Sequence, residues 1–172
     1  MRDPDFHPSD FELGQPLAEF ELDDEQSTRA LGAALGAALR AGDFLGLVGT
    51  LGAGKTTLVQ GLTASLAPQV VTTSPTYTLV NLYPANPPIA HIDLYRLENF
   101  DDLESIGYWD VIESGDAIVC VEWFSAIPDS WPEEGVVLML EPLPSGRRAR
   151  LWATDSHRDV AQRAIEHFQH RS

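Results

Sequence analysis

The sequence predicts a single α/β domain in which helices flank a mixed parallel and antiparallel sheet. Three observations support this prediction. An apolar run at 44–49 is followed by a glycine-rich turn and then by a helical pattern, which is the order of a strand–helix unit. The second half of the chain carries short apolar runs separated by turn residues. The length of 172 residues suits one domain with its own core.

The first half is expected to contain a strand, a helix, a strand and a helix. The first strand alternates apolar and polar residues, and the first helix carries leucines and alanines at helical spacing. Gly32 and Gly36 on that helix allow another element to pack closely. The second strand is apolar between glycines, and Pro68 stops the second helix. The four elements are expected at 18–22, 24–40, 44–49 and 55–67.

The second half is expected to be rich in strands. Proline-rich and glycine-containing turns separate the apolar runs, and one or two short helices are expected between them. The strands are expected at 76–83, 88–95, 117–123, 136–140 and 147–153, and the short helices at 101–114. We expect residues 1–16 to form a flexible acidic tail, 17–154 the folded domain and 155–172 a C-terminal helical extension.

The charge balance argues against a nucleic-acid or membrane surface. The chain has 26 acidic and 11 basic residues, a formal net charge of −15, which repels phosphate backbones and anionic lipids. A group of arginines, Arg147, Arg148 and Arg150, is interpreted as a solvated strand edge rather than a nucleic-acid patch. We therefore expect no direct nucleic-acid binding and no membrane association.

The chain has one cysteine, Cys120, which lies in an apolar run. It has no partner for a disulfide within the chain, which suits a reducing compartment, and we expect a cytoplasmic protein. Because of its apolar surroundings, Cys120 is interpreted as a small buried side chain rather than a nucleophile.

The glycine-rich turn carries a phosphate-binding motif. The stretch GTLGAGKT fits G-x-x-x-x-G-K-[ST], the P-loop, in which backbone N–H groups and a helix N-terminus surround phosphate oxygens. Lys55 is the only lysine of the chain and would reach the β- and γ-phosphates, while the Thr56 hydroxyl would ligate Mg²⁺. A nucleoside triphosphate and Mg²⁺ are the expected cofactors; the motif leaves the choice between ATP and GTP open, and ATP is what the family resemblance described below implies. The nucleotide-binding residues expected here are Gly49, Thr50, Leu51, Gly52, Ala53, Gly54, Lys55, Thr56 and Thr57.

Two carboxylates follow apolar strand candidates and are candidate metal ligands. Asp93 ends a run interrupted by His91, and Glu122 ends five uninterrupted apolar residues. A P-loop NTPase needs such a carboxylate to hold Mg²⁺ or to polarise the attacking water. At least one of the two is expected at the metal, and the sequence leaves open which of them binds it directly. Lys55, Asp93 and Glu122 are the candidate catalytic residues.

A hydroxyl-rich segment between the motif helix and the next strand is a candidate switch. Pro75 forces Ser74 into an extended conformation, and the hydroxyls of Ser74 and Thr76 are within reach of a γ-phosphate or a metal-bound water. A polar turn with no further role is the alternative interpretation.

Five segments together resemble the TsaE (YjeE) family of bacterial P-loop ATPases in tRNA threonylcarbamoyladenosine biosynthesis. The matching pieces are STRALG (27–32), GTLGAGKTTLVQGL (49–62), SPTYTLV (74–80), HIDLYRL (91–97) and VEW (121–123). The combination of S-P-T with H-x-D-x-Y-R is more specific than the P-loop alone. The second P-loop position is commonly acidic in this family, whereas this chain has Thr50.

The resemblance implies both a function and residue roles. It implies ATP hydrolysis that is slow alone and faster with two partner proteins, TsaD and TsaB, and that drives or resets their catalytic cycle. Thr28 would contact the base or ribose, Asp93 would be the Walker B aspartate, and Glu122 would help to hold Mg²⁺ or water beside Trp123. Ser74 and Thr76 would belong to the nucleotide-sensing switch.

Two other functions remain as alternatives. The first is a small-molecule P-loop kinase, although such enzymes usually carry an arginine-rich lid and residues 98–116 hold no basic residue. The second is a nucleotide-gated binding switch with negligible turnover. The presence of two candidate carboxylates argues mildly against the switch.

Overall fold

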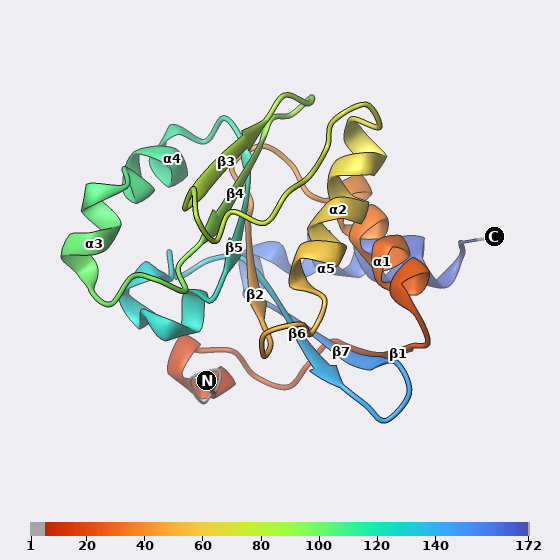
Figure 1. The fold of residues 1–172 in the computed structure, drawn as a ribbon. Helices are drawn as coiled ribbons and strands as arrows, with labels where there is room; N and C mark the ends of the chain where they lie inside the picture. Colours follow the sequence, from red (N-terminus) through yellow and green to blue (C-terminus); the bar gives the residue numbers. More distant parts are fainter. Residues whose placement is uncertain (1–5, 172) are drawn as a thin grey trace.

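The computed structural model describes residues 6–171, and within them the chain forms a seven-stranded sheet in the order β1-β7-β6-β2-β5-β4-β3. Helices lie on both faces of this sheet (Figure 1). The strands are β1 (Ala18–Leu22), β2 (Phe44–Val48), β3 (Val80–Tyr83), β4 (Ile89–Asp93), β5 (Ile118–Glu122), β6 (Val136–Pro142) and β7 (Arg147–Ala153). The α-helices are α1 (Glu25–Ala38), α2 (Lys55–Leu66), α3 (Phe100–Ser105), α4 (Tyr108–Ser114) and α5 (Arg158–Gln169). The mixed sheet confirms the predicted fold class.

The centre of the sheet is parallel and its edges are antiparallel. β6, β2, β5 and β4 run parallel to one another, while β7, β1 and β3 join in the antiparallel sense. Every residue of β2, β4 and β5 is buried, as expected for parallel strands covered on both faces. The register pairs Leu47 with Glu122 and Asp93 with Glu122. The carboxyl ends of these three strands therefore meet at one edge.

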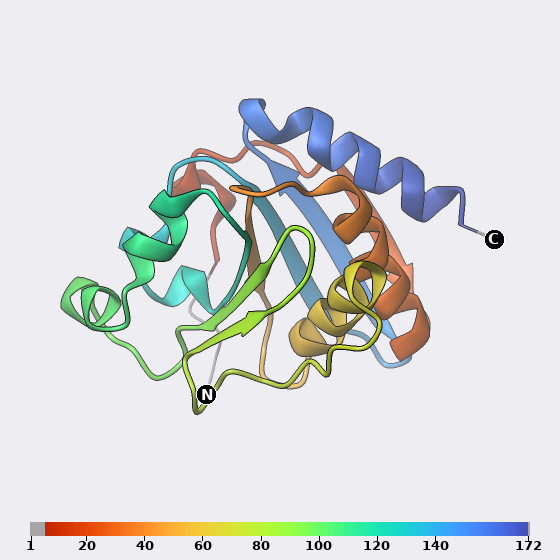
Figure 2. The same cartoon turned by 90° about the horizontal axis from the view of Figure 1, so that it is seen from above.

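Two hydrophobic cores lie on opposite faces of the sheet. One face is covered by α1, α2 and α5, and the other by α3, α4, the short 3₁₀ turns and the N-terminal segment (Figure 2). Strand alternation separates the two sets. Leu45 and Leu47 of β2 belong to the first core, and Phe44 and Val48 belong to the second. None of the helices within residues 6–171 is long and apolar enough to cross a bilayer.

The strand expected at 76–83 is shorter than predicted. Residues up to Leu79 form turns, and β3 begins only at Val80. Leu79 has a φ of 68°, which no strand residue adopts, and its N–H donates to the carbonyl of Pro75 at 2.6 Å. The turn keeps the hydroxyl-rich segment out of the sheet.

The prediction of a flexible tail at 1–16 is wrong for its described part, because residues 6–16 pack against the domain. Phe11 and Leu13 are buried, and the Phe11 ring lies 5.1 Å from that of Phe124 and 6.0 Å from that of Trp131. The indole N–H of Trp152 donates to the carbonyl of Gly14 at 3.2 Å. These isolated apolar residues show no periodicity within a polar stretch, so the sequence pattern does not reveal them. Residues 1–5 of the expected tail lie outside the described part.

The expected C-terminal extension packs into the first core. Five residues of α5 are buried, and the Phe168 ring lies 4.8 Å from that of Phe20 in β1. Its apolar stripe covers the sheet beside α1. In its described part, the segment is therefore a layer of the domain rather than an addition to it.

The close contact of α1 and α2 depends on glycines. A Cβ atom added to Gly32 would overlap the carbonyl oxygen of Leu58, and one added to Gly61 would overlap that of Arg29. The backbones of the two helices therefore touch where they cross. This contact fixes the position of α2, whose first residue is Lys55.

Gly32→Ala is expected to lower the free energy of unfolding by about 1–3 kcal/mol, because the new methyl group has to separate two backbones. Urea denaturation measures the change. Gly14→Ala is the matched control, since nothing lies within 4 Å of its added Cβ. Equal stability of the two variants would contradict the close crossing.

Candidate nucleotide-binding site

The P-loop joins β2 to α2 and has the backbone that a phosphate site needs. Gly52 and Gly54 have φ values of 81° and 111°, in the left-handed region that favours glycine. The motif ends where α2 begins, so the positive end of that helix faces the loop. The predicted strand–loop–helix context is confirmed.

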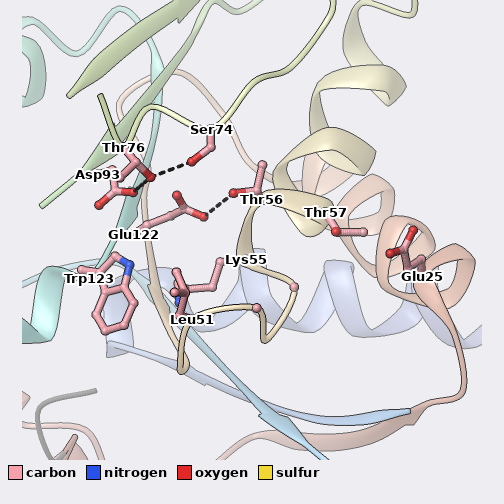
Figure 3. A pocket seen from close by; sticks show the side chains of 12 residues that line it. Glu25, Leu51, Lys55, Thr56, Thr57, Ser74, Thr76, Asp93, Glu122 and Trp123 are labelled. Carbon is pink, nitrogen blue, oxygen red and sulfur yellow. Dashed lines mark hydrogen bonds between the residues drawn. The ribbon is translucent and has the colours of Figure 1, made fainter. Parts of the chain in front are cut away.

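A pocket of about 290 Å³ opens beside this loop (Figure 3). It collects side chains from the P-loop, the hydroxyl-rich segment and the ends of β4 and β5. Its lining residues are Glu25, Leu51, Gly52, Gly54, Lys55, Thr56, Thr57, Ser74, Thr76, Asp93, Glu122 and Trp123. Most of the residues predicted from the sequence therefore share one cavity.

Five predicted site residues do not line this pocket: Thr28, Gly49, Thr50, Ala53 and Pro75. Gly49, Ala53 and Pro75 are buried, and Thr50 is exposed. Glu25 lines the pocket although the sequence analysis did not single it out. Its only signal is its place directly after the helix N-cap Asp24.

Lys55 lies over the loop that carries it. Its Nζ donates to the carbonyl of Gly49 and, at 3.1 Å, to that of Thr50. It also lies 4.1 Å from the ring centroid of Trp123, a cation–π distance. Lys55 is 6% exposed and belongs to the lining of the pocket. In P-loop proteins, the lysine at this position of the motif binds phosphate oxygens.

Glu122 and Thr56 lie opposite each other in the pocket. The Thr56 hydroxyl donates to Glu122 Oε1 at 3.0 Å, although 66 residues separate them in the chain. Glu122 is 2% exposed. The parallel register that aligns β2 with β5 brings the P-loop threonine to the end of the neighbouring strand.

Asp93 lies next to Glu122 and is held by two hydrogen bonds. The hydroxyl of Thr76 and the N–H of Tyr95 each donate to one carboxylate oxygen at 2.8 Å. The pKa of Asp93 is raised above its usual value, chiefly by burial, and these two hydrogen bonds oppose the shift. The neutral form of Asp93 is therefore favoured over the charged form, and a cation bound to the carboxylate would offset the cost of burying its charge.

The hydroxyl-rich segment reaches the same carboxylate. The hydroxyls of Ser74 and Thr76 lie 2.8 Å apart, and Thr76 already donates its proton to Asp93. Ser74 is thus linked to Asp93 through Thr76. The geometry connects the candidate switch to the candidate metal site.

The donor set fits Mg²⁺. The Thr56 hydroxyl and the carboxylates of Asp93 and Glu122 are hard oxygen donors that line one cavity, and Mg²⁺ is usually held by one or two carboxylates together with waters and phosphate oxygens. Among residues 6–171, no three His, Cys, Asp or Glu side chains form a complete protein cage for a metal. A shared metal–nucleotide site fits this set better than a structural metal.

Thr28 does not have the position that its expected contact with base or ribose requires. It is fully buried, its hydroxyl donates to the carbonyl of Asp24 at 3.1 Å, and it accepts from Arg147 Nη1 at 3.2 Å. A Cβ added at Gly54 would overlap the same guanidinium, so Arg147 lies against the P-loop. Thr28 therefore positions Arg147 beside the loop.

Cys120 is buried in the first core, and burial raises the pKa of its thiol to about 12. A thiol of this kind stays protonated at neutral pH and is a poor nucleophile. Its interpretation as a packed apolar side chain is confirmed.

Asp93→Asn is expected to stabilise the chain without nucleotide and to weaken metal-dependent binding. A raised pKa means that ionising Asp93 costs folding free energy as pH rises through the folded-state pKa. The near-isosteric amide removes that cost and can still pair with Tyr95 and Thr76, so Tm should rise at pH 7. The gain should vanish below pH 3.8, the ordinary pKa, where both states are protonated. A Tm that falls at pH 7 would contradict the argument.

Thr28→Val is expected to cost about 1 kcal/mol of unfolding free energy, because it removes two hydrogen bonds while keeping the shape. Calorimetric titration with ATP should show little change in affinity. Greatly weakened binding with unaltered stability would restore a direct contact with the nucleotide.

Comparison with known proteins agrees with this geometry. Residues 22–149 match a family described as threonylcarbamoyl adenosine biosynthesis protein TsaE. The chain is 46% identical to the TsaE of a Nostoc species over 115 residues (65% of this chain, 71% of the relative), and 35% identical to that of Treponema pallidum over 123 residues (72% and 90%). The crystal structure of Bacillus subtilis YdiB has the same fold, with a TM-score of 0.73 at 22% identity over 90% of this chain and 97% of that one. The chain belongs to the TsaE family.

Proposed function

We propose that the chain binds and hydrolyses ATP with Mg²⁺ and acts with TsaD and TsaB in the formation of tRNA threonylcarbamoyladenosine. The relatives described above carry that biosynthesis in their names. The proposal of ATP hydrolysis rests on one observation. At the end of the P-loop, the Thr56 hydroxyl donates to Glu122 at 3.0 Å, and Asp93 lies beside Glu122 on the next strand. These groups are what Mg²⁺-dependent phosphoryl chemistry requires.

Each side chain has a distinct role in this proposal. Lys55 binds the terminal phosphates as a point charge, and the Thr56 hydroxyl supplies one oxygen toward the metal. One of the two carboxylates holds the metal or its water shell, and the other orients the attacking water and accepts its proton. Bound Mg²⁺ would supply charge neutralisation on the phosphate oxygens.

The surroundings of the pocket argue against the kinase alternative. The helical region α3–α4, which would have to serve as a lid, is acidic over 101–113. Arg96, the arginine nearest to it in the chain, lies 5.1 Å from the centroid of the Tyr77 ring. No arginine lines the pocket among the described residues, so a clamp for a transferred phosphoryl group is missing from this part of the chain.

Exposed apolar side chains near the pocket support a protein partner. Leu51, at the tip of the P-loop, is 76% exposed, and Tyr77, next to Thr76, is 83% exposed. Large apolar groups left in solvent around a functional cavity are typical of an interaction surface. The net charge of −15 favours contact through protein surfaces rather than through tRNA.

ATP turnover should be measured for the chain alone and with the TsaB–TsaD pair of its own organism. We expect slow hydrolysis alone and clear stimulation by the pair, with Lys55→Ala as the blank. Glu122→Gln should lower kcat by about 100-fold, since the neutral amide can neither accept the water proton nor hold the metal as a carboxylate does, while ATP affinity in EDTA should change far less.

Two results would count against the proposal. Rapid ATP turnover without stimulation by the pair would point to a P-loop NTPase with other partners. ATP that stays intact after long incubation with both partners would favour the nucleotide-gated switch.

A further inference from the structure

A buried chain of polar side chains runs beneath the pocket from β3 through β4 to β5. The Tyr83 hydroxyl lies 3.0 Å from His91 Nδ1, and His91 Nε2 lies 3.5 Å from Glu122 Oε2. The three residues are 6%, 0% and 2% exposed, respectively. No hydrogen-bond partner at normal distance is found for His91 Nε2 among the described residues, so this buried nitrogen faces the carboxylate alone. The mechanism proposed above does not use His91 or Tyr83.

The surroundings of His91 select one tautomer. With Glu122 as a carboxylate, a bare ring nitrogen facing it would be repelled, so this arrangement requires a proton on Nε2. In the neutral ring, Nδ1 is then an acceptor, and Tyr83 is the group placed to donate to it. The hydrogen bond at one ring nitrogen thereby fixes the proton at the other.

The Tyr83 hydroxyl has a second acceptor. The carbonyl of Thr73 lies 2.9 Å away, and a hydroxyl has one proton, so Tyr83 can serve either His91 or Thr73 at a given moment. The N–H of Thr73 also donates to the Tyr83 oxygen at 3.3 Å. Thr73 directly precedes Ser74, so the candidate switch segment is attached to Tyr83 by its backbone.

We propose that His91 is a positioning residue for Glu122, that Tyr83 selects its tautomer, and that Thr73 couples this pair to the Ser74–Thr76 segment. The inference rests on the proposed function, since it gives Glu122 its orientation for that reaction. Thr56 holds Glu122 Oε1, and His91 faces Oε2, so both oxygens of the carboxylate are directed. Loss of the second contact frees the carboxylate to rotate.

The competing explanation is that His91 only fills space in the sheet, in which case substitutions would change stability alone. Two variants separate these possibilities. The amide nitrogen of His91→Gln falls near the position of Nε2 and can still donate to Glu122. That of His91→Asn falls near Nδ1 and cannot reach the carboxylate. Both are smaller than the imidazole, so both are expected to lower stability.

We expect His91→Asn to lower kcat by about 10- to 100-fold. We expect the same variant to reduce, by a similar factor, the increase in ATP affinity that Mg²⁺ produces. His91→Gln should recover most of both, and ATP affinity in EDTA should change little in either variant. Equal kcat and equal metal dependence in the two variants would overturn the positioning role.

Tyr83→Phe should lower kcat through the tautomer, and Tyr108→Phe is its matched control. Tyr108 is also buried, and its hydroxyl donates to the carbonyl of Ser130 at 2.7 Å in the second core. Both variants lose a buried hydroxyl and stability, but only Tyr83→Phe should slow turnover. A kcat for Tyr83→Phe equal to that of Tyr108→Phe would overturn the role of Tyr83.

The tautomer itself is measured by ¹⁵N-detected imidazole NMR, with His91→Asn identifying the signal. A proton on Nε2 and none on Nδ1 supports the inference, and a proton on Nδ1 alone overturns it. Protons on both nitrogens would keep the contact with Glu122 and overturn the role given to Tyr83. This readout needs no turnover. If the wild-type chain hydrolyses no ATP, the proposed function fails, while the tautomer and the Mg²⁺ dependence of binding still decide the inference.

Discussion

The parallel register of β2, β5 and β4 is the constraint on which the site depends. It places Glu122 beside both Leu47 and Asp93, so the loop after β2 and the last residues of two neighbouring strands meet at one edge. Ligand sites in open α/β sheets form at the carboxyl ends of strands for this reason. A shift of one residue in either pairing would turn a carboxylate toward the opposite core, because side chains alternate along a strand.

The position of the P-loop depends on the helices behind it. The glycine contact between α1 and α2 holds the backbones together, and α1 also supplies Thr28, which directs Arg147 against Gly54. Asp93 works against stability, because burial disfavours its charge, while Thr56 and His91 face the two oxygens of Glu122. A buried acid of this kind is typical of sites that trade stability for function.

The sequence predicts those parts of the site whose residues are contiguous in the chain or follow a known spacing. The P-loop follows from its spacing, and the two carboxylates follow from their place after apolar runs. The roles that depend on three-dimensional packing did not follow: Thr28 faces inward from α1 toward Arg147, 119 residues away. Tyr83 and His91 meet because the antiparallel register pairs Asn81 with His91 and leaves Tyr83 as a diagonal neighbour. Phe11 is buried against Phe124 and Trp131, which lie far from it in the chain, so no local sequence pattern predicts its burial.

The charge balance of the pocket bears on how fast the chain can work alone. Its lining contains one ammonium group, that of Lys55, and three carboxylates, those of Glu25, Asp93 and Glu122. Rapid phosphoryl transfer in P-loop enzymes usually requires an additional arginine near the phosphates, supplied within the chain or by a partner, and such a group is worth about 10³–10⁵ in kcat. Arg147 lies against Gly54 but is not among the lining residues, so the described lining does not provide this group. Under the proposed function, a partner that covered the exposed rim at Leu51 and Tyr77 would accelerate turnover most directly by bringing positive charge to the phosphates.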